Sequence, residues 1–284
     1  MVFMREKFEL GEPVFLSNMM VYPILGEGRE VEVATLEEES REGRVEIMET
    51  GDVNSLDVDY RGGNELLIIQ GEEIVGAMQN RIFATSMLLP RGRENVPVYC
   101  VEEGRWSGEG NLRPSGYIAF PSVRSIISQG TPETQASVWK EISRKQTTLK
   151  IQSKTRAMTE SFRQKEEELN YYRDYRPLPE QVGFAVFSNL RFLGLEVFSN
   201  PGVFQAFLEK LLLSYGLDAL EDRMKEGQER RVKPEEALQA LDKTQLKERK
   251  NPGVGRLLSG FTRLLVIRKL VKEGVLLHGS VFLK

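Results

Sequence analysis

Residues 71–106 read GEEIVGAMQNRIFATSMLLPRGRENVPVYCVEEGRW and combine strand-like apolar runs with clusters of polar side chains. The apolar runs are Ile82–Leu89 and Val96–Val101, and Pro90-Arg91-Gly92-Arg93 separates them. A glycine between two apolar runs predicts a β-hairpin, because glycine accepts the positive φ that tight turns require. We therefore expect this stretch to form part of an antiparallel sheet.

The segments before this stretch carry the same kind of pattern. Leu56–Tyr60 and Glu65–Gln70 flank Arg61-Gly62-Gly63-Asn64, which predicts a second hairpin. Val45–Glu49 alternates apolar and polar residues, as a strand with one solvated face does. The chain up to about Phe120 is therefore expected to be an antiparallel sheet system, either a sandwich or a partly open barrel.

Helical signals begin beyond residue 130 and are followed by further strands. The expected elements are a helix opening at 131–133, a charged helix over about 155–172, a hairpin of 183–188 with 192–198, a helix capped by Asn200, a charged connector at 226–233, a helix over 234–246 and a strand pair of 261–270 with 275–282. The predicted fold class is α+β: an antiparallel β-sandwich or partly open barrel with several packed and peripheral helices. We expect a single compact domain over 1–284, which is β-rich over 1–125, helical over 131–175 and mixed over 181–284.

The composition is that of an ordinary soluble protein, with 40% hydrophobic and 29% charged residues among 284. A net charge of -3 and a pI near 5.6 argue against general nucleic-acid binding. Charged residues interrupt the N-terminal sequence MVFMREKFELGEP, so it does not resemble a signal peptide. No apolar run approaches the ~20 residues that a membrane span requires. We expect a cytoplasmic protein without membrane association, and a homo-oligomer is compatible with the sequence.

The chain has one cysteine, Cys100, and one histidine, His278. A single cysteine excludes an intramolecular disulfide and any site with several cysteine ligands. A single histidine disfavours most zinc sites and leaves a metal bound by carboxylates alone as the open alternative. The sequence therefore assigns no metal ligands and no cofactor.

Several short motifs are spread along most of the chain. They are Gly71–Ala77, Gln79–Arg81, Val101–Trp106, Ser137–Trp139, Gln181–Gly183, Gly194–Phe198, Ser214–Leu220 and Val275–Phe282. Together they resemble the ARPP domain family, named for its association with ADP-ribosylglycohydrolases and rhodanese-phosphatases. The resemblance implies a role near NAD or ADP-ribose metabolism, and it implies no particular reaction.

The first candidate site consists of Glu72, Glu73, Gln79, Asn80 and Arg81. The two glutamates follow a glycine at a predicted strand end, so the backbone can turn and present a carboxylate there. The guanidinium could bind phosphate in a forked geometry, and the two amides could bind ribose hydroxyls or a base edge. In the structural alternative, the arginine forms an internal ion pair with a glutamate and the amides satisfy buried backbone groups.

The second candidate site consists of Glu102, Glu103, Arg105 and Trp106, where the strand holding Cys100 ends. Two carboxylates facing each other across a cleft are what glycosidic cleavage uses, and an N-glycosidic bond to ribose could be attacked in the same way. The alternative is a cluster of ion pairs at the rim with the tryptophan packed as an anchor.

The expected roles follow from these residue types. Glu72, Glu102 and His278 are the candidate catalytic residues, the last because an imidazole can transfer protons near neutral pH. The candidate ligand-binding residues are Gln79, Asn80, Arg81, Glu103, Arg105 and Trp106.

Two hypotheses from different classes remain. In the first, the protein binds or processes a small nucleotide-derived ligand such as ADP-ribose, in a pocket where Glu72, Arg81, Glu102 and Arg105 converge. In the second, it is a non-enzymatic scaffold or a module that binds a protein partner, for instance through the charged helix expected at 155–172. The sequence leaves open whether the protein is an enzyme.

Overall fold

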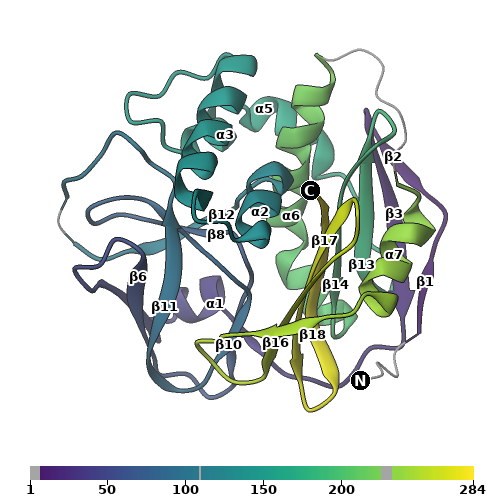
Figure 1. Cartoon of the computed structure of the whole chain (residues 1–284), viewed down its shortest axis with the longest axis horizontal. Coiled ribbons are helices and arrows are strands. Elements are labelled where there is room, and N and C mark those ends of the chain that lie inside the picture. The colour runs from purple at the N-terminus through teal and green to yellow at the C-terminus, as the bar shows by residue number, and fades with distance from the viewer. Residues whose placement is uncertain (1–6, 109, 225–231) are drawn as a thin grey trace. The chain divides into compact units, whose positions relative to one another are not determined.

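A computed structural model describes residues 7–108, 110–224 and 232–284, which form an α+β fold rich in antiparallel strands (Figure 1). The chain divides into two compact units: unit 1 comprises 1–31, 167–250 and 255–284, and unit 2 comprises 32–166 and 251–254. The expected absence of a signal peptide and the expected charged connector rest partly on 1–6 and 225–231, which lie outside the described residues. The single domain expected from the sequence stays a prediction.

Unit 2 contains the stretch 71–106. Its elements are β4 (Ala34–Thr35), α1 (Leu36–Arg41), β5 (Val45–Glu49), β6 (Ser55–Tyr60), β7 (Leu66–Ile68), β8 (Glu72–Val75), β9 (Arg81–Phe83), β10 (Met87–Leu89), β11 (Gly92–Cys100), β12 (Arg113–Ile118), α2 (Pro121–Gln129), α3 (Thr134–Thr148) and α4 (Thr159–Gln164).

The strands of unit 2 form two sheets, one of which curls. The larger sheet has the order β12-β8-β9-β11-β6-β5, and the smaller has the order β10-β7-β4. An isolated bridge between Ile47 of β5 and Leu112, which directly precedes β12, connects the two ends of the larger sheet. This curled half-barrel confirms the expected antiparallel fold with a partly open barrel.

Alternation of side chains builds the core of unit 2. In β6, Leu56, Val58 and Tyr60 are buried, whereas the residues between them are partly exposed. The buried residues pack with Phe83, Met87 and other apolar side chains from both sheets. Burial of one face of β6 is the pattern that the period-2 sequence signal predicts, whereas β7, β9 and β10 are buried at every residue.

Of the two hairpins predicted for this region, the first is wrong and the second is right in part. The strands at 55–60 and 66–68 do not pair, because β6 lies between β5 and β11 while β7 lies between β10 and β4. Neither Gly62 nor Gly63 adopts the positive φ that a tight turn would use. The run 82–89 breaks into β9, which pairs with β11 as predicted, and β10, which joins β7 in the other sheet.

The predicted helices also differ from the structure in two places. The predicted helix over about 155–172 is divided into α4, α5 (Glu166–Leu169) and the 3₁₀ turn η1 (Asn170–Tyr172), because the backbone leaves the helical region at Lys165. Helix α2 was not predicted. Pro121 stands in its first turn, and residues 125–128 read Ser-Ile-Ile-Ser. This short pattern matches neither the period of a strand nor that of an amphipathic helix.

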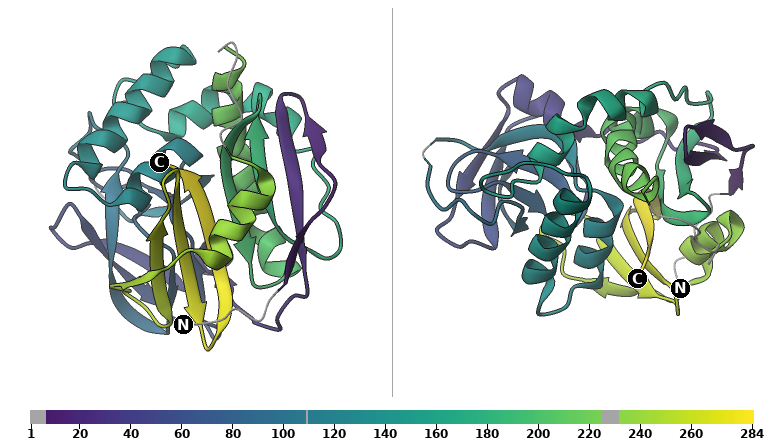
Figure 2. Two further views of the ribbon diagram at one scale, coloured as in Figure 1. Left: turned by 45° about the vertical axis from the view of Figure 1, so that its right-hand side comes forward. Right: turned by 90° about the horizontal axis from the view of Figure 1, so that it is seen from above.

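Unit 1 is built around one antiparallel sheet. Its strands are β1 (Phe8–Leu10), β2 (Val14–Leu16), β3 (Met19–Gly26), β13 (Gln181–Ser188), β14 (Arg191–Phe198), β15 (Lys247–Arg249), β16 (Arg256–Phe261), β17 (Leu265–Lys272) and β18 (Val275–Leu283), and its main helices are α6 (Pro201–Asp222) and α7 (Pro234–Lys243). The order is β1-β3-β13-β14-β18-β17-β16-β15, with β2 also paired to β3. The predicted pairs β13–β14 and β17–β18 are confirmed, and Figure 2 shows the C-terminal strands side by side.

The two faces of this sheet pack against different helices. Leu195 and Val197 of β14 join a core that includes Ala237 and Leu241 of α7. Helix α6 packs against the other face, where its Tyr215 ring lies edge-on to Phe184 of β13. The predicted cap of α6 is confirmed, since the Asn200 side chain accepts a hydrogen bond from the Val203 N–H at 2.9 Å.

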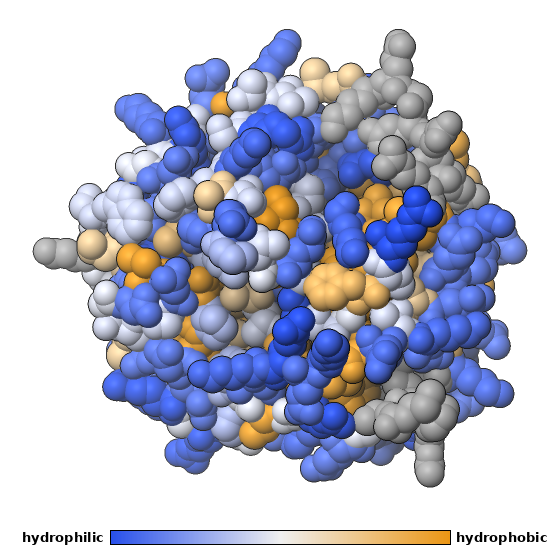
Figure 3. Space-filling view, in the orientation of Figure 1, coloured by the Kyte–Doolittle hydropathy of each residue, from blue (hydrophilic) through white to orange (hydrophobic). Residues whose placement is uncertain are grey.

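Among the described residues, few large apolar side chains are exposed, and Phe15 and Tyr171 are the most exposed of them. Figure 3 shows one face on which hydrophilic residues predominate and apolar ones occur in small groups. In the ranges that the structure describes, no helix combines the length and the apolar character needed to cross a membrane.

Candidate functional site

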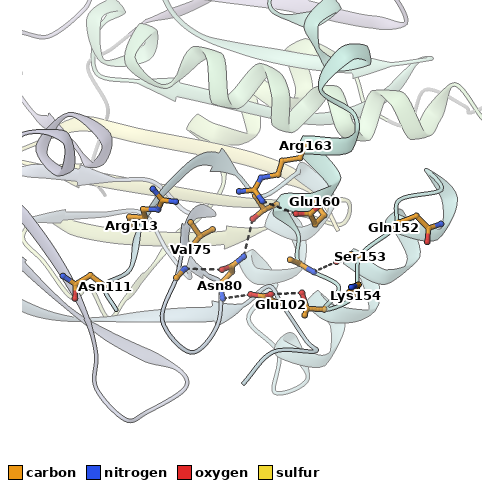
Figure 4. Close-up of a pocket in the computed structure, with 14 residues that line it drawn as sticks. Val75, Asn80, Glu102, Asn111, Arg113, Gln152, Ser153, Lys154, Glu160 and Arg163 are labelled. Atoms are coloured by element: carbon orange, nitrogen blue, oxygen red, sulfur yellow. Dashed lines mark hydrogen bonds and ion pairs between the residues drawn. The ribbon is translucent and has the colours of Figure 1, made fainter. Parts of the chain in front are cut away.

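Unit 2 contains a polar cavity of about 530 Å³ (Figure 4). It is lined by Val75, Gly76, Asn80, Glu102, Asn111, Arg113, Gln152, Ser153, Lys154, Thr155, Ala157, Thr159, Glu160 and Arg163. These residues come from the end of β8, the loops that follow β8 and β11, the start of β12, the segment between α3 and α4, and α4 itself. Four of these lining residues, Val75, Gly76, Asn80 and Glu102, belong to the stretch 71–106.

Strand pairing brings Asn80 and Glu102 together. Arg81 of β9 pairs with Cys100 of β11, so the residues just beyond this pair lie at the same end of the sheet. The Val101 N–H donates to the Asn80 carbonyl at 3.0 Å, and the Asn80 N–H donates to Glu102 Oε2 at 3.2 Å. The hairpin-like pairing predicted from the sequence therefore positions two of the candidate residues.

The segment 155–158 closes over this sheet end through backbone hydrogen bonds. Gly104 N–H donates to the Thr155 carbonyl at 2.9 Å, and Met158 N–H donates to the Val101 carbonyl at 2.9 Å. A Cβ atom at position 104 would lie 3.0 Å from Thr155 Cα, so a side chain there would push the two segments apart. A glycine is the residue that permits this close approach.

Glu102 presents an ionised carboxylate to the cavity. Its Oε1 accepts a hydrogen bond from the Thr155 hydroxyl at 2.7 Å, and its Oε2 lies 2.7 Å from Arg105 Nη2. Burial alone would raise the pKa of Glu102, but the hydrogen bonds from Arg105, Thr155 and the Asn80 N–H outweigh it and hold the pKa below its ordinary value. This carboxylate can accept hydrogen bonds from a ligand or act as a base.

Arg105 stabilises the cavity wall and does not line the cavity. Its guanidinium donates to the Ala77 carbonyl at 2.5 Å and to Asn80 Oδ1 at 3.0 Å, besides pairing with Glu102. The next residue, Trp106, is 50% exposed. Arg105 therefore has the internal role of the structural alternative, while Trp106 stands at the surface next to a residue bonded to the cavity wall.

Glu73 lies behind the cavity wall. It is 1% exposed, and it shares the cavity-facing side of β8 with Val75, because side chains two residues apart on a strand point the same way. The Thr159 hydroxyl, which lines the cavity, donates to Glu73 Oε1 at 2.7 Å. Burial raises the pKa of Glu73 to about 7, and the hydroxyls of Thr159 and Ser115 and the positive charge of Arg163 only partly oppose this.

The neighbouring Glu72 points elsewhere. It is buried, and its Oε2 accepts a hydrogen bond from the Ile69 N–H at 2.7 Å. Glu72 does not line the cavity. The structure thus places Glu73, rather than the candidate catalytic Glu72, next to the cavity wall.

Gln79 and Arg81 are buried and bonded internally. Arg81 Nη1 donates to Gln79 Oε1 at 2.9 Å, and Arg81 Nη2 lies 3.9 Å from Glu49 Oε2 of β5. The Gln79 amide donates to the Glu102 carbonyl. These contacts match the structural alternative, in which the arginine pairs with a glutamate and the amide satisfies a buried backbone group.

The remaining candidates lie outside the cavity lining. Glu103 pairs with Arg156 at 2.5 Å on the surface. His278 belongs to unit 1, where its Nε2 is 2.8 Å from Glu196 Oε2. Tyr215 of α6 donates to the other oxygen of Glu196 at 2.9 Å. Of the four residues expected to converge in a pocket, only Glu102 lines this cavity.

Three cations line the cavity that sequence reasoning did not single out: Arg113, Lys154 and Arg163. Arg163 lies 3.2 Å from Glu160 within α4, and Figure 4 shows the two side chains side by side on one wall. The three come from β12, a loop and α4, and no periodic signal links these segments in the sequence. In the parts of the chain that the structure describes, no cluster of three or more histidine, cysteine, aspartate or glutamate side chains is arranged to hold a metal ion.

Comparison with known proteins identifies one family. The model of the ARG and Rhodanese-Phosphatase-superfamily-associated Protein domain matches residues 7–282, which is nearly the whole chain. No curated protein and no solved structure shows a significant match to the chain.

Proposed function

The chain belongs to the ARPP family, and on that premise we propose that unit 2 binds a small anionic, hydroxyl-rich ligand of the nucleotide-derived class, such as ADP-ribose. The cavity of unit 2 carries this proposal because its lining combines cations with an ionised carboxylate and several amides and hydroxyls. The family name adds the direction of ADP-ribose chemistry and does not specify a reaction.

The three cations support binding of phosphate. Arg113 and Lys154 form no side-chain hydrogen bond or ion pair within the ranges that the structure describes. No carboxylate of these ranges neutralises their charges, and both residues line the cavity. Arginine binds phosphate through two parallel N–H groups, and lysine binds it as a compact charge. A ligand with two linked phosphates would use both.

The carboxylate, amides and hydroxyls of the lining support binding of a sugar. Glu102 can accept hydrogen bonds from hydroxyl groups, and Asn80 and Asn111 can donate and accept them. The cavity volume of about 530 Å³ falls in the range typical of small-molecule sites. Its polar lining favours a sugar phosphate over an apolar ligand.

Trp106 supplies a surface for the base of such a ligand. The residues that line the cavity include no aromatic ring. Trp106 is 50% exposed and directly follows Arg105 in the chain. The Arg105 guanidinium bonds to the cavity residues Asn80 and Glu102. This exposed indole, next in the chain to Arg105, could stack on a base that extends beyond the sugar-phosphate site.

Processing of the ligand would depend on Glu102. This carboxylate lines the cavity and is ionised, so it could act as a base or nucleophile toward a bond to the anomeric carbon of ribose.

Tryptophan fluorescence tests the proposal, because the chain has only two tryptophans, Trp106 and Trp139, and both belong to unit 2. Titration with ADP-ribose, and separately with NAD, should change the emission of the wild type and of Trp139→Phe, but not that of Trp106→Phe. Arg113→Ala and Lys154→Ala should each weaken binding about tenfold or more, as loss of a charge-assisted hydrogen bond does. Binding should be followed in parallel by calorimetry, which does not depend on Trp106.

The alternative function is a non-enzymatic scaffold or a module that binds a protein partner. The internal bonds of Gln79, Arg81 and Arg105 favour it, because these candidate ligand-binding residues hold the fold together. Absence of calorimetric and fluorescence signals for both ligands at millimolar concentration would reject the nucleotide-derived ligand and support the scaffold.

A further inference from the structure

We propose that Glu73 is a positioning residue that sets the hydrogen-bond direction of the Thr159 hydroxyl at the cavity, so that binding of an anionic ligand is coupled to protonation of Glu73. This inference rests on the proposed function, since it concerns the same cavity and the same class of ligand.

The Thr159 hydroxyl makes two hydrogen bonds beside the cavity. It lines the cavity, donates to Glu73 Oε1 at 2.7 Å and accepts from Asn80 Nδ2 at 3.4 Å. A hydroxyl has one hydrogen and two lone pairs. While its hydrogen points to Glu73, Thr159 can offer only a lone pair to a ligand, which suits a sugar hydroxyl and disfavours a phosphate oxygen.

The two carboxyl oxygens of Glu73 differ in their surroundings. Oε2 is buried and has no hydrogen-bond partner among the residues that the structure describes. A buried carboxylate oxygen without a partner penalises the ionised form, and protonation removes that penalty. A protonated Glu73 can donate to Thr159, and the Thr159 hydrogen is then free to point into the cavity and to bind an anionic oxygen.

The charges around Glu73 act in opposite directions. Arg163 of α4 favours the ionised form of Glu73, whereas the carboxylate of Glu102 disfavours it. The hydroxyls of Thr159 on α4 and Ser115 on β12 lower the pKa of Glu73 less than burial raises it, to about 7. Both protonation states are therefore populated near neutral pH, and an anion that enters the cavity favours the protonated one.

The first measurement is calorimetry with ADP-ribose between pH 6 and pH 8.5, in buffers of different ionisation enthalpy. The pyrophosphate of this ligand does not titrate in that range, so any proton exchange belongs to the protein. The wild type should take up a fraction of a proton on binding at pH 7, and its affinity should fall by up to about tenfold per pH unit above 7. Glu73→Gln and Thr159→Val should bind with little dependence on pH, and Thr159→Ser should behave as the wild type does.

Glu166→Gln provides the matched control, because it removes one exposed carboxylate of the same unit that does not line the cavity. It should retain the proton uptake of the wild type. ADP-ribose binding without proton uptake, or proton uptake that persists in Glu73→Gln, overturns the inference and leaves the proposed function intact.

The second measurement needs no ligand and separates the two proposals. Carboxyl ¹³C resonances of glutamate-labelled protein, assigned by comparison with Glu73→Gln, give the titration of Glu73 directly. Its midpoint should lie near neutral pH, should rise in Thr159→Val because the ionised form loses a hydrogen bond, and should return in Thr159→Ser. A midpoint at the ordinary value of a glutamate, or one that Thr159→Val does not move, overturns the inference even if ADP-ribose binds. If ADP-ribose does not bind, the proposed function fails, and a neutral midpoint that Thr159→Val raises still supports the coupling of Glu73 to Thr159.

Discussion

Arg105 Nη2 lies 2.7 Å from Glu102 Oε2, and the same guanidinium donates to the carbonyl oxygens of Gly76 and Ala77. One side chain therefore keeps a cavity-lining carboxylate ionised and ties the loop after β8 to the loop after β11. The pKa of Glu102 is lower in the folded protein than its ordinary value of 4.5. The ionised carboxylate therefore contributes fully to the free energy of unfolding at a pH above about 4.5, and this contribution is lost as the pH falls through the folded-state pKa.

Replacement of this arginine should destabilise unit 2. We expect Arg105→Met to lower the free energy of unfolding at pH 7 by roughly 2–4 kcal/mol, because it leaves a largely buried carboxylate without its cation. Urea unfolding followed by tryptophan fluorescence measures this change. Arg156→Met is the control, since its pair with Glu103 is exposed and should contribute no more than about 1 kcal/mol. Equal losses in the two variants would contradict the internal role of Arg105.

Arg81 and Arg113 should separate stability from binding. Arg81 is fully buried among strands, whereas Arg113 is exposed and lines the cavity. We expect Arg81→Ala to cost roughly 3–5 kcal/mol of unfolding free energy, because it leaves a cavity and removes the cation near Glu49, with ADP-ribose affinity unchanged in the folded fraction. Arg113→Ala should show the opposite behaviour: stability within about 0.5 kcal/mol of wild type and weaker binding. A loss of affinity in both variants would return Arg81 to the ligand site.

The sequence predicted the part of the site that depends on local pairing. Asn80 and Glu102 lie together because β9 and β11 pair, and the apolar runs of both strands are visible in the sequence. Glu72 and Glu73 are adjacent glutamates, so the sequence does not show which of them lies next to the cavity. The answer depends on which face of β8 is turned toward Thr159. Thr159 is 86 residues from Glu73 in the chain, and no pattern connects the two.

The same limit applies to the fold. The strands at 55–60 and 66–68 were located from their composition, but their partners come from segments that a local turn signal cannot reveal. The strand that contains His278 was also predicted. The contact of His278 with Glu196, 82 residues away in the chain, depends on the pairing of β14 with β18. Long-range pairing is set by packing of the whole core, which a single sequence does not display.

Glu196 should be more important for the stability of unit 1 than either of its partners. This fully buried carboxylate contacts both the His278 imidazole and the Tyr215 hydroxyl. We expect Glu196→Ala to lower the free energy of unfolding by roughly 3–5 kcal/mol, because two buried polar groups lose their acceptor. Tyr215→Phe removes one hydrogen bond and should cost only about 1 kcal/mol. Hydrogen exchange of the β14 and β18 amides measures both effects within unit 1, and a larger loss for Tyr215→Phe would contradict the central role of Glu196.

Glu73 should make unit 2 less stable as the pH rises. Its pKa is about 7 in the folded protein, against an ordinary value of 4.5, so the folded chain binds more protons than the unfolded chain between these two values. The free energy of unfolding therefore falls as the pH increases from 4.5 to 7, by about 3 kcal/mol if Glu73 titrates alone.

Glu73→Gln keeps a neutral side chain of the same shape and removes this dependence. We expect the variant to match the wild type near pH 4.5 and to exceed its stability by up to about 3 kcal/mol at pH 8, as measured by urea unfolding with tryptophan fluorescence. Glu166→Gln should follow the wild type at every pH, because this carboxylate is exposed. A Glu73→Gln protein that is less stable than the wild type at pH 8 would show that ionised Glu73 is held by favourable interactions stronger than the penalty of its burial.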